Sequence, residues 1–155
     1  MLDIFTVSFF GHRRIEDFRQ VEKQLDELVH RLIREKEYVD FLIGRNGEFD
    51  QLVSSTVRRA KRDIDNSKSS LILVLPYMTA EYGNNKESFE EYYDEIEICA
   101  SKHQKSAFRL RNRAMVDRSD LVVFCVDRSD GGAFQTAKYA KRIGKEYINL
   151  GSLDL

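Results

Sequence analysis

Residues 4–14, Ile-Phe-Thr-Val-Ser-Phe-Phe-Gly-His-Arg-Arg, decide the fold of this chain. The segment Ile4–Phe10 is β-branched and aromatic and stops at Gly11, which is typical of a buried strand that feeds a tight turn. We expect it to be the first and central strand of a sheet. An amphipathic stretch follows, in which apolar residues recur at spacings of three and four, and this predicts a helix with one buried stripe. These apolar residues are Phe18, Val21, Leu25, Leu28 and Leu32.

The order of strand, glycine turn and helix then occurs a second time. Val39–Ile43 is a short apolar run that ends at Gly44-Arg45-Asn46-Gly47. The next helix is marked by Val53, Val57, Ala60 and Ile64. A third strand is predicted over Leu71–Leu75, ended by Pro76 because a proline cannot donate to the strand ladder.

The remaining elements continue this alternation. Strands are expected over Leu121–Val126 and Glu146–Leu150, and helices from about Ala107 and over Phe134–Ile143, with Gly131-Gly132 as the turn before the last helix. Met78–Glu97 is acidic and rich in tyrosine, so we interpret it as a surface excursion with a short helix near Phe89–Tyr93. Glu95–Cys99 is a candidate for one further short strand.

Buried strands that alternate with amphipathic helices indicate right-handed βαβ crossovers. The fold class is therefore α/β, a Rossmann-like three-layer sandwich with a mainly parallel sheet and helices on both faces. The 155 residues contain no linker, repeat or low-complexity tract, so residues 1–155 are expected to form a single domain. The 42% hydrophobic and 33% charged fractions exclude a disordered chain.

The net charge, the cysteines and the histidines argue against several classes of function. With 25 Lys plus Arg against 26 Asp plus Glu, a generally basic nucleic-acid binder is not expected, although a local basic face is allowed. Cys99 and Cys125 lie outside any CxxC pattern and are interpreted as reduced, partly buried thiols of a cytoplasmic protein. No export or membrane segment is expected. His12, His30 and His103 lack metal-ligand spacing, so neither a metal nor another cofactor is expected. A Walker loop and a nucleophile elbow are also missing from the sequence.

The turns that follow the strands are the candidate site. In a parallel sheet all strands end at one edge, and ligands bind in the crevice near the point where the strand order reverses. This edge is expected to collect Gly11-His12-Arg13, Gly44-Arg45-Asn46-Gly47, Pro76 and Asp130-Gly131-Gly132. Three of these turns join glycine to the start of a helix, and helix N-termini with close backbone approach suit a phosphate. Each turn alone is ordinary turn chemistry, whereas their convergence favours an anion site.

Individual side chains in these turns have competing interpretations. Arg13 is expected to contact a phosphate or carboxylate through its planar donor fork, although it could be a solvated turn residue. His12 is a ligand contact or proton-transfer group on one interpretation and a backbone cap on the other. Asp50 is interpreted as a helix N-cap rather than a catalytic acid. Phe49 either stacks on a base or locks the loop from the core, and Glu48 is a general base or simply hydrated.

A basic segment on the predicted helix from about Ala107 is the second part of the site. It contains Arg109, Arg111, Asn112, Arg113 and Met115. Residues four apart share a helix face, so Arg109 and Arg113 point together and Arg111 points elsewhere. The segment either closes over an anionic ligand, forms a solvated basic face, or pairs with the acidic stretch before it. The basic cluster Arg58, Arg59, Lys61 and Arg62 is diluted by aspartates and is interpreted as a solvated helix face.

These motifs together resemble the SLOG superfamily. The resemblance is carried by Phe9-Phe10-Gly11-His12-Arg13, by Gly44-Arg45-Asn46-Gly47-Glu48-Phe49-Asp50, by Arg111-Asn112-Arg113-Ala114-Met115-Val116-Asp117-Arg118-Ser119-Asp120, and by Gly131-Gly132-Ala133 with Thr136, Tyr139-Ala140 and Ile148-Asn149-Leu150 behind it. It extends over almost the whole chain and is strongest to the small, uncharacterised single-domain members from bacteria and phage that are related to YpsA. It implies a Rossmann-like domain that binds nucleotides or nucleotide-derived ligands.

The superfamily contains lonely-guy enzymes, which cleave the N-glycosidic bond of nucleotides, and DNA-processing protein A, which binds single-stranded DNA. Lonely-guy enzymes carry a Pro-Gly-Gly-x-Gly-Thr-x-x-Glu loop, and the corresponding segment here is Asp130-Gly131-Gly132-Ala133-Phe134-Gln135-Thr136-Ala137-Lys138-Tyr139. Glycosidic cleavage needs a carboxylate. The resemblance therefore carries over the phosphate cradle without the catalytic glutamate.

The leading hypothesis is thus a sensing or regulatory module that binds a nucleotide or nucleotide-sugar. An N-glycoside hydrolase with Asp50, Glu48 or His12 as the acid or base is one alternative, and a single-stranded nucleic-acid or protein adaptor is another. A membrane partner is not expected, and superfamily relatives often form homodimers. The predicted ligand-binding residues are Gly11, His12, Arg13, Gly44, Asn46, Gly47, Asp50, Pro76, Arg111, Asn112, Arg113, Met115, Gly131, Gly132, Ala133 and Thr136.

Overall fold

A computed structural model describes residues 1–100 and 105–155 of the chain. In these residues six strands form one sheet in the order β4-β3-β2-β1-β5-β6, and every neighbouring pair is parallel. The strands are β1 (Ile4–Gly11), β2 (Tyr38–Ile43), β3 (Ser69–Tyr77), β4 (Glu95–Ala100), β5 (Leu121–Cys125) and β6 (Tyr147–Asn149). β1 lies inside the sheet, between β2 and β5, as its apolar sequence predicts.

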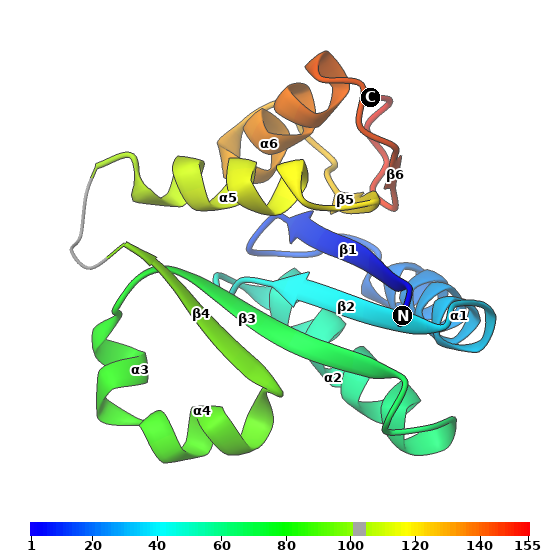
Figure 1. The fold of residues 1–155 in the computed structure, drawn as a ribbon. Coiled ribbons are helices and arrows are strands. Elements are labelled where there is room, and N and C mark those ends of the chain that lie inside the picture. Colours follow the sequence, from blue (N-terminus) through cyan, green and yellow to red (C-terminus); the bar gives the residue numbers. More distant parts are fainter. Residues whose placement is uncertain (101–104) are drawn as a thin grey trace.

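Helices cover both faces of this sheet (Figure 1). α1 (Phe18–Glu35) and α2 (Glu48–Asp63) pack together on one face, and α5 (Ala107–Asp117) and α6 (Gly131–Arg142) pack together on the other. Two short helices, α3 (Ala80–Asn84) and α4 (Lys86–Tyr92), connect β3 to β4. The Rossmann-like α/β sandwich with a parallel sheet is therefore confirmed.

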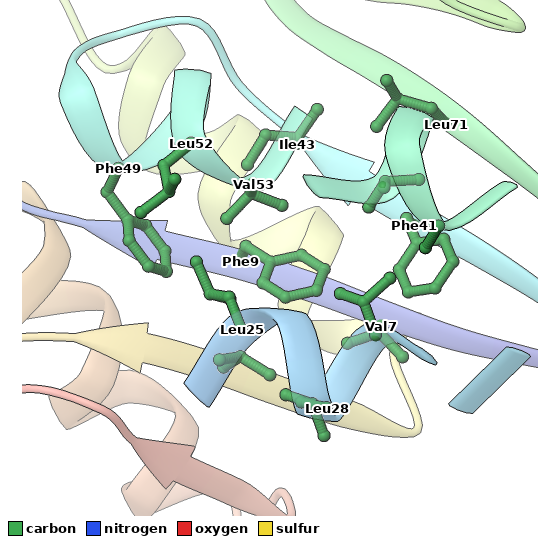
Figure 2. Packing of buried hydrophobic residues seen from close by; sticks show 14 of the residues in the cluster. Val7, Phe9, Leu25, Leu28, Phe41, Ile43, Phe49, Leu52, Val53 and Leu71 are labelled. Atoms are coloured by element: carbon green, nitrogen blue, oxygen red, sulfur yellow. The ribbon is translucent and has the colours of Figure 1, made fainter. Parts of the chain in front are cut away.

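The side chains of β1 alternate between two cores. Val7 and Phe9 belong to the cluster under α1 and α2, whereas Phe10 belongs to the cluster under α5 and α6. Figure 2 shows Val7 and Phe9 of β1 beside side chains of α1, with Leu25 in the same cluster. Because each face of β1 is buried, its register is fixed, and the turn after Gly11 is held at the edge of the sheet.

The structure differs from the sequence prediction at several elements. Pro76 does not end the third strand, because β3 continues to Tyr77, which pairs with Ala100 of β4. The pairing of β2 with β3 ends at Ile43 and Leu73, so Pro76 lies beyond the part of β3 that needs donors on both sides. Gly131 and Gly132 form the first turn of α6 rather than a turn before it. Helix α3 was not expected at all.

The remaining expectations concern β4, two helix starts, the cysteines and His103. The short strand near Glu95 and the helices that begin at Phe18 and Ala107 lie where they were predicted. Both cysteines are free thiols, and Cys125 is buried, whereas Cys99 lies exposed on the edge strand β4 and is not partly buried as expected. His103 lies outside the described residues. Within residues 1–100 and 105–155, none of the helices combines the length and the apolar character needed to cross a membrane.

Chain order reverses between β1 and β5. From β1 the chain proceeds through β2 and β3 toward one edge of the sheet, and β5 and β6 then follow on the other side of β1. At such a point the loops after the two strands separate, because their helices lie on opposite faces, and a crevice opens between them. The loops after β1 and β5 border this crevice.

Candidate functional site

A cavity of about 350 Å³ lies at the carboxyl ends of β1 and β5. We call it the α6 cavity. Eleven of the predicted ligand-binding residues line it, namely Gly11, His12, Arg13, Gly44, Asn46, Asp50, Arg111, Asn112, Gly131, Gly132 and Ala133. Four residues that sequence reasoning missed complete its wall: Phe9, Phe10, Phe108 and Arg128. Its volume is in the range of about 300–1,000 Å³ that is usual for small-molecule sites.

The N-terminus of α6 opens into this cavity. Asp130 is the N-cap residue, but its side chain makes no capping hydrogen bond and instead accepts one from Arg128 Nε over 2.9 Å. Gly131 has φ +87°, a conformation that favours glycine. At Gly132 an added Cβ would meet no atom within 4 Å. The first turn of α6 is therefore open on the cavity side, which allows an anion to approach its backbone N–H groups.

A chain of hydrogen bonds connects Arg111 to the start of α6. Arg111 is buried, and its Nη1 donates to the carbonyl oxygen of Val74 while its Nε donates to Asn112 Oδ1, both over 3.0 Å. Asn112 Nδ2 donates to Thr136 Oγ1 over 3.1 Å, and Thr136 Oγ1 donates to the carbonyl oxygen of Gly132 over 2.8 Å. The Arg-Asn pair thus fixes α5 against β3 and the first turn of α6.

Asp50 and Arg111 occupy the floor of the cavity beside Gly44. An added Cβ at Gly44 would lie 2.9 Å from Arg111 Nη1 and 3.2 Å from Asp50 Oδ2, so only glycine leaves room for both side chains. Burial raises the pKa of Asp50 to about 6, although the backbone N–H of Asn46 donates to Oδ2 over 2.9 Å and the charge of Arg111 acts in the opposite direction. Burial also lowers the pKa of the Arg111 guanidinium.

Two of the predicted glycines are required by protein packing. A Cβ at Gly11 would overlap the ring of Phe49, which is fully buried. A Cβ at Gly47 would lie 2.5 Å from Arg13 Cα, and the backbone N–H of Glu48 donates to the carbonyl oxygen of Arg13 over 2.9 Å. The glycines thus let the loops after β1 and β2 pack on each other, and Phe49 has its core role rather than a stacking role.

His12 forms part of the cavity wall next to α6. Its Nε2 lies 3.4 Å from Asp127 Oδ1 but makes no hydrogen bond to it, and its Nδ1 would lie 3.8 Å from a Cβ at Gly131. Burial and the nearby charge of Arg128 lower the pKa of His12, against the opposing effect of Asp127. The structure therefore supplies a carboxylate neighbour that the sequence did not reveal.

No protein-family model and no curated protein matches this chain. Among solved structures, DNA processing protein A (DprA) from Streptococcus pneumoniae matches 94% of this chain and 50% of its own, with a TM-score of 0.67 at 15% identity. DNA processing protein A from Helicobacter pylori, whose structure was described for its single-stranded DNA binding mode, matches 94% of this chain and 64% of its own, with a TM-score of 0.66 at 17% identity.

This chain has a DprA-like fold. It spans between half and two thirds of the DprA chains that it matches. This similarity confirms the fold that the resemblance to the SLOG superfamily implies. The narrower likeness to small single-domain members stays a prediction.

Five predicted ligand-binding residues of this DprA-like fold do not line the α6 cavity. Gly47 packs against Arg13 in the loop after β1, and Pro76 lies in β3. Met115 belongs to the core under α5 and α6. Arg113 stacks on Tyr139, with its Cζ 4.6 Å from the ring centroid, so it points along the outside of α6. Thr136 acts behind the cavity through Gly132.

The catalytic candidates are also placed by the fold. Asp50 is not a helix N-cap, because Gly47 takes that position and Asp50 lies inside the first turn of α2. Glu48 is exposed and does not line the α6 cavity. Arg128 was missed although it lies in the same loop as Gly131, and this proximity was an available signal. Within the described residues, no group of three or more His, Cys, Asp or Glu side chains is placed to hold a metal ion.

Proposed function

We propose that this chain binds a nucleotide or nucleotide-derived ligand in the α6 cavity, with a phosphate at the N-terminus of α6. The observation that carries the proposal is the open first turn of α6, where a Cβ at Gly132 would meet no atom within 4 Å. A helix N-terminus of this kind offers backbone N–H donors and a partial positive charge to an anion.

The charges around the cavity support an anionic ligand. Its charged lining residues are Arg13, Arg111 and Arg128 against the single Asp50. Arg13 is exposed and can turn toward a ligand, whereas Arg111 is fixed below it. Arg128 is half-exposed and contacts Asp127 and Asp130, so it reaches a ligand only by exchanging these contacts. Guanidinium groups match the geometry of phosphate oxygens and remain charged at all physiological pH values.

The aromatic lining supports a ligand that carries a ring as well as a phosphate. Phe108 of α5 lines the cavity with 41% of its surface exposed. An exposed aromatic face beside an anion site is available for stacking on a base. Phe10, by contrast, is buried against Phe124 and serves the core.

A single DNA strand is the second candidate ligand. It is favoured by the fold similarity to H. pylori DprA, a protein described for binding single-stranded DNA. The same phosphate position would then hold one backbone phosphate of the strand. The glycosidase alternative receives less support, because Glu48 lies outside the cavity and Asp50 is buried below it.

Isothermal titration with pyrophosphate, AMP, ADP and a short oligodeoxythymidine tests the proposal. We expect the Gly132→Leu variant to fold, because Gly132 is helical and a side chain there enters open space. This side chain would occupy the phosphate position, so affinity for pyrophosphate should fall at least about tenfold, or about 1.4 kcal/mol. The matched control is Gly83→Leu on α3, where a Cβ also meets nothing within 4 Å and no cavity is lined.

The outcomes separate the candidates. Binding of mononucleotides that is lost in Gly132→Leu supports the nucleotide site. Binding of the oligonucleotide alone, with a steep fall in affinity as salt increases, supports the DNA strand. Unchanged pyrophosphate affinity in Gly132→Leu would contradict both, because both place a phosphate at α6.

A further inference from the structure

A second cavity, of about 580 Å³, lies between α1, α2 and α4. We call it the α4 cavity. It shares only Gly44 and Asp50 with the α6 cavity, so the loop after β2 separates the two. The nucleotide proposal does not use this cavity, and its volume alone fits a drug-sized ligand.

The charge of the α4 cavity is opposite to that of the α6 cavity. Its charged lining residues are Glu22, Glu48 and Asp50 against the single Arg45. Glu22 comes from the first turns of α1 and Glu48 begins α2, so two carboxylates from different helices face one space. A phosphate is therefore disfavoured here, and a group that donates hydrogen bonds or carries positive charge is favoured.

The single arginine is already occupied by neighbouring side chains. Arg45 Nε donates to Glu81 Oε1 over 2.8 Å, and its Nη1 donates to the Tyr93 hydroxyl over 2.9 Å. Its Cζ also lies 4.7 Å from the centroid of the Phe89 ring. Because these contacts satisfy and fix Arg45, it adds little free positive charge to the cavity.

Aromatic rings and hydroxyls make up much of the remaining wall. Phe18, Phe89, Tyr92 and Tyr93 line the cavity from α1 and from the α4 region. Phe18 is 42% exposed although it starts an amphipathic helix, which leaves its face open to a ligand. Ser54, Ser55 and Ser88 add short polar groups. Flat rings beside carboxylates are the combination that recognises a planar group with amino donors.

We propose that the α4 cavity is a second ligand site, which binds a flat aromatic ring with an exocyclic amino group, such as the base of adenosine. The ring stacks on the exposed face of Phe18, and its amino group donates to Glu22 or Glu48. This site stands independently of the phosphate site at α6. It extends the recognition surface of the chain to the α1 and α2 side of the sheet.

The experiment compares two nucleosides, neither of which carries a phosphate. Adenosine has the exocyclic amino group and uridine does not. Ser88 is exposed on α4 and lines the cavity, so Ser88→Trp places a large side chain in the cavity without removing a core contact. Ser55→Trp on α2 fills it from the opposite wall. Ser152→Trp is the matched control, because Ser152 is exposed and lines neither cavity.

We expect the unaltered chain to bind adenosine more tightly than uridine. Ser88→Trp and Ser55→Trp should each weaken adenosine at least about tenfold, equivalent to about 1.4 kcal/mol, while pyrophosphate affinity is unchanged. At least one of Glu22→Gln and Glu48→Gln should weaken adenosine binding more than uridine binding, because only adenosine has the exocyclic amino group. Gly132→Leu should leave adenosine binding intact, which separates this site from the α6 cavity. Equal affinity for uridine, absence of adenosine binding, or adenosine binding that survives both tryptophan variants would overturn the proposal.

Discussion

Asn112 and Thr136 join the two helices on the cavity side of the sheet, since Asn112 Nδ2 donates a hydrogen bond to Thr136 Oγ1 over 3.1 Å. Thr136 Oγ1 in turn donates to the carbonyl oxygen of Gly132 in the first turn of α6. Neither Thr136 nor its hydroxyl lines the α6 cavity, so Thr136 is a positioning residue. Through it, α5 determines where the open end of α6 lies.

Thr136→Val keeps the shape of the side chain and removes its hydroxyl. Asn112 Nδ2 then loses its acceptor, and we expect the free energy of unfolding to fall by about 1–3 kcal/mol. Pyrophosphate affinity should fall as well, because the first turn of α6 is held less firmly. Urea unfolding and titration calorimetry measure the two effects. Thr136→Ser keeps the hydroxyl, and its failure to retain pyrophosphate affinity would contradict the positioning role.

Gly11→Ala tests the packing of the loop after β1 on α2. The new Cβ would overlap the buried Phe49 ring, so the free energy of unfolding should fall by about 1–3 kcal/mol. Phe49→Leu replaces the ring with a smaller side chain and makes room for the new Cβ. In the double variant the two losses in unfolding free energy should therefore be non-additive by about 0.5–3 kcal/mol. Gly132→Ala is the control, because it fills open space on a helix and should not destabilise. Additive losses in the double variant would mean that the Phe49 ring is not the reason why residue 11 must be glycine.

The sequence predicts most of this fold because both faces of β1 and the stripes of α1 and α2 carry strong periodic patterns. It places Gly11, Gly44 and Gly132 in one site because parallel strands end at one edge. It does not distinguish Gly11 and Gly44, where a Cβ would clash with other side chains, from Gly132, where a Cβ would face open space. That distinction depends on Phe49, Arg13 and Arg111, which approach from other elements. The neighbour of His12, Asp127, lies more than a hundred residues away in sequence, so spacing could not reveal it.

The pKa of Asp50 gives a stability prediction with a defined sign. Its folded value of about 6 exceeds the ordinary value of 3.8, so folding favours the protonated acid. Below pH 3.8 both states are protonated and there is no cost. Between pH 3.8 and pH 6 the unfolded state loses its proton first, so stability falls as pH rises. Above pH 6 both states are ionised, and the full cost of the buried charge remains. A shift of about two pH units corresponds to about 3 kcal/mol.

Asp50→Asn removes this titration and keeps an oxygen for the Asn46 N–H. The variant should gain stability relative to the unaltered chain between pH 4 and pH 7, by up to about 3 kcal/mol. Urea unfolding at several pH values measures the difference. His12 is present in both proteins, so its own titration cancels to first order. A difference that is constant over this pH range would show that Asp50 does not titrate as its burial implies.

Arg128 is the arginine of the α6 cavity that lies beside the N-terminus of α6, so its removal changes the charge at the proposed phosphate position. It pairs with Asp127 and Asp130, and Arg128→Gln would leave both carboxylates uncompensated beside the end of α6. Pyrophosphate affinity should fall at least about tenfold, because a hydrogen bond to a charged group contributes about 1.5–3 kcal/mol. The loss should shrink as salt is added, since exposed charges are screened. Arg109→Gln is the matched control, because Arg109 is exposed on α5 and does not line the cavity. If the two variants lose pyrophosphate affinity equally, the effect comes from net charge alone and not from the position of Arg128 at the phosphate.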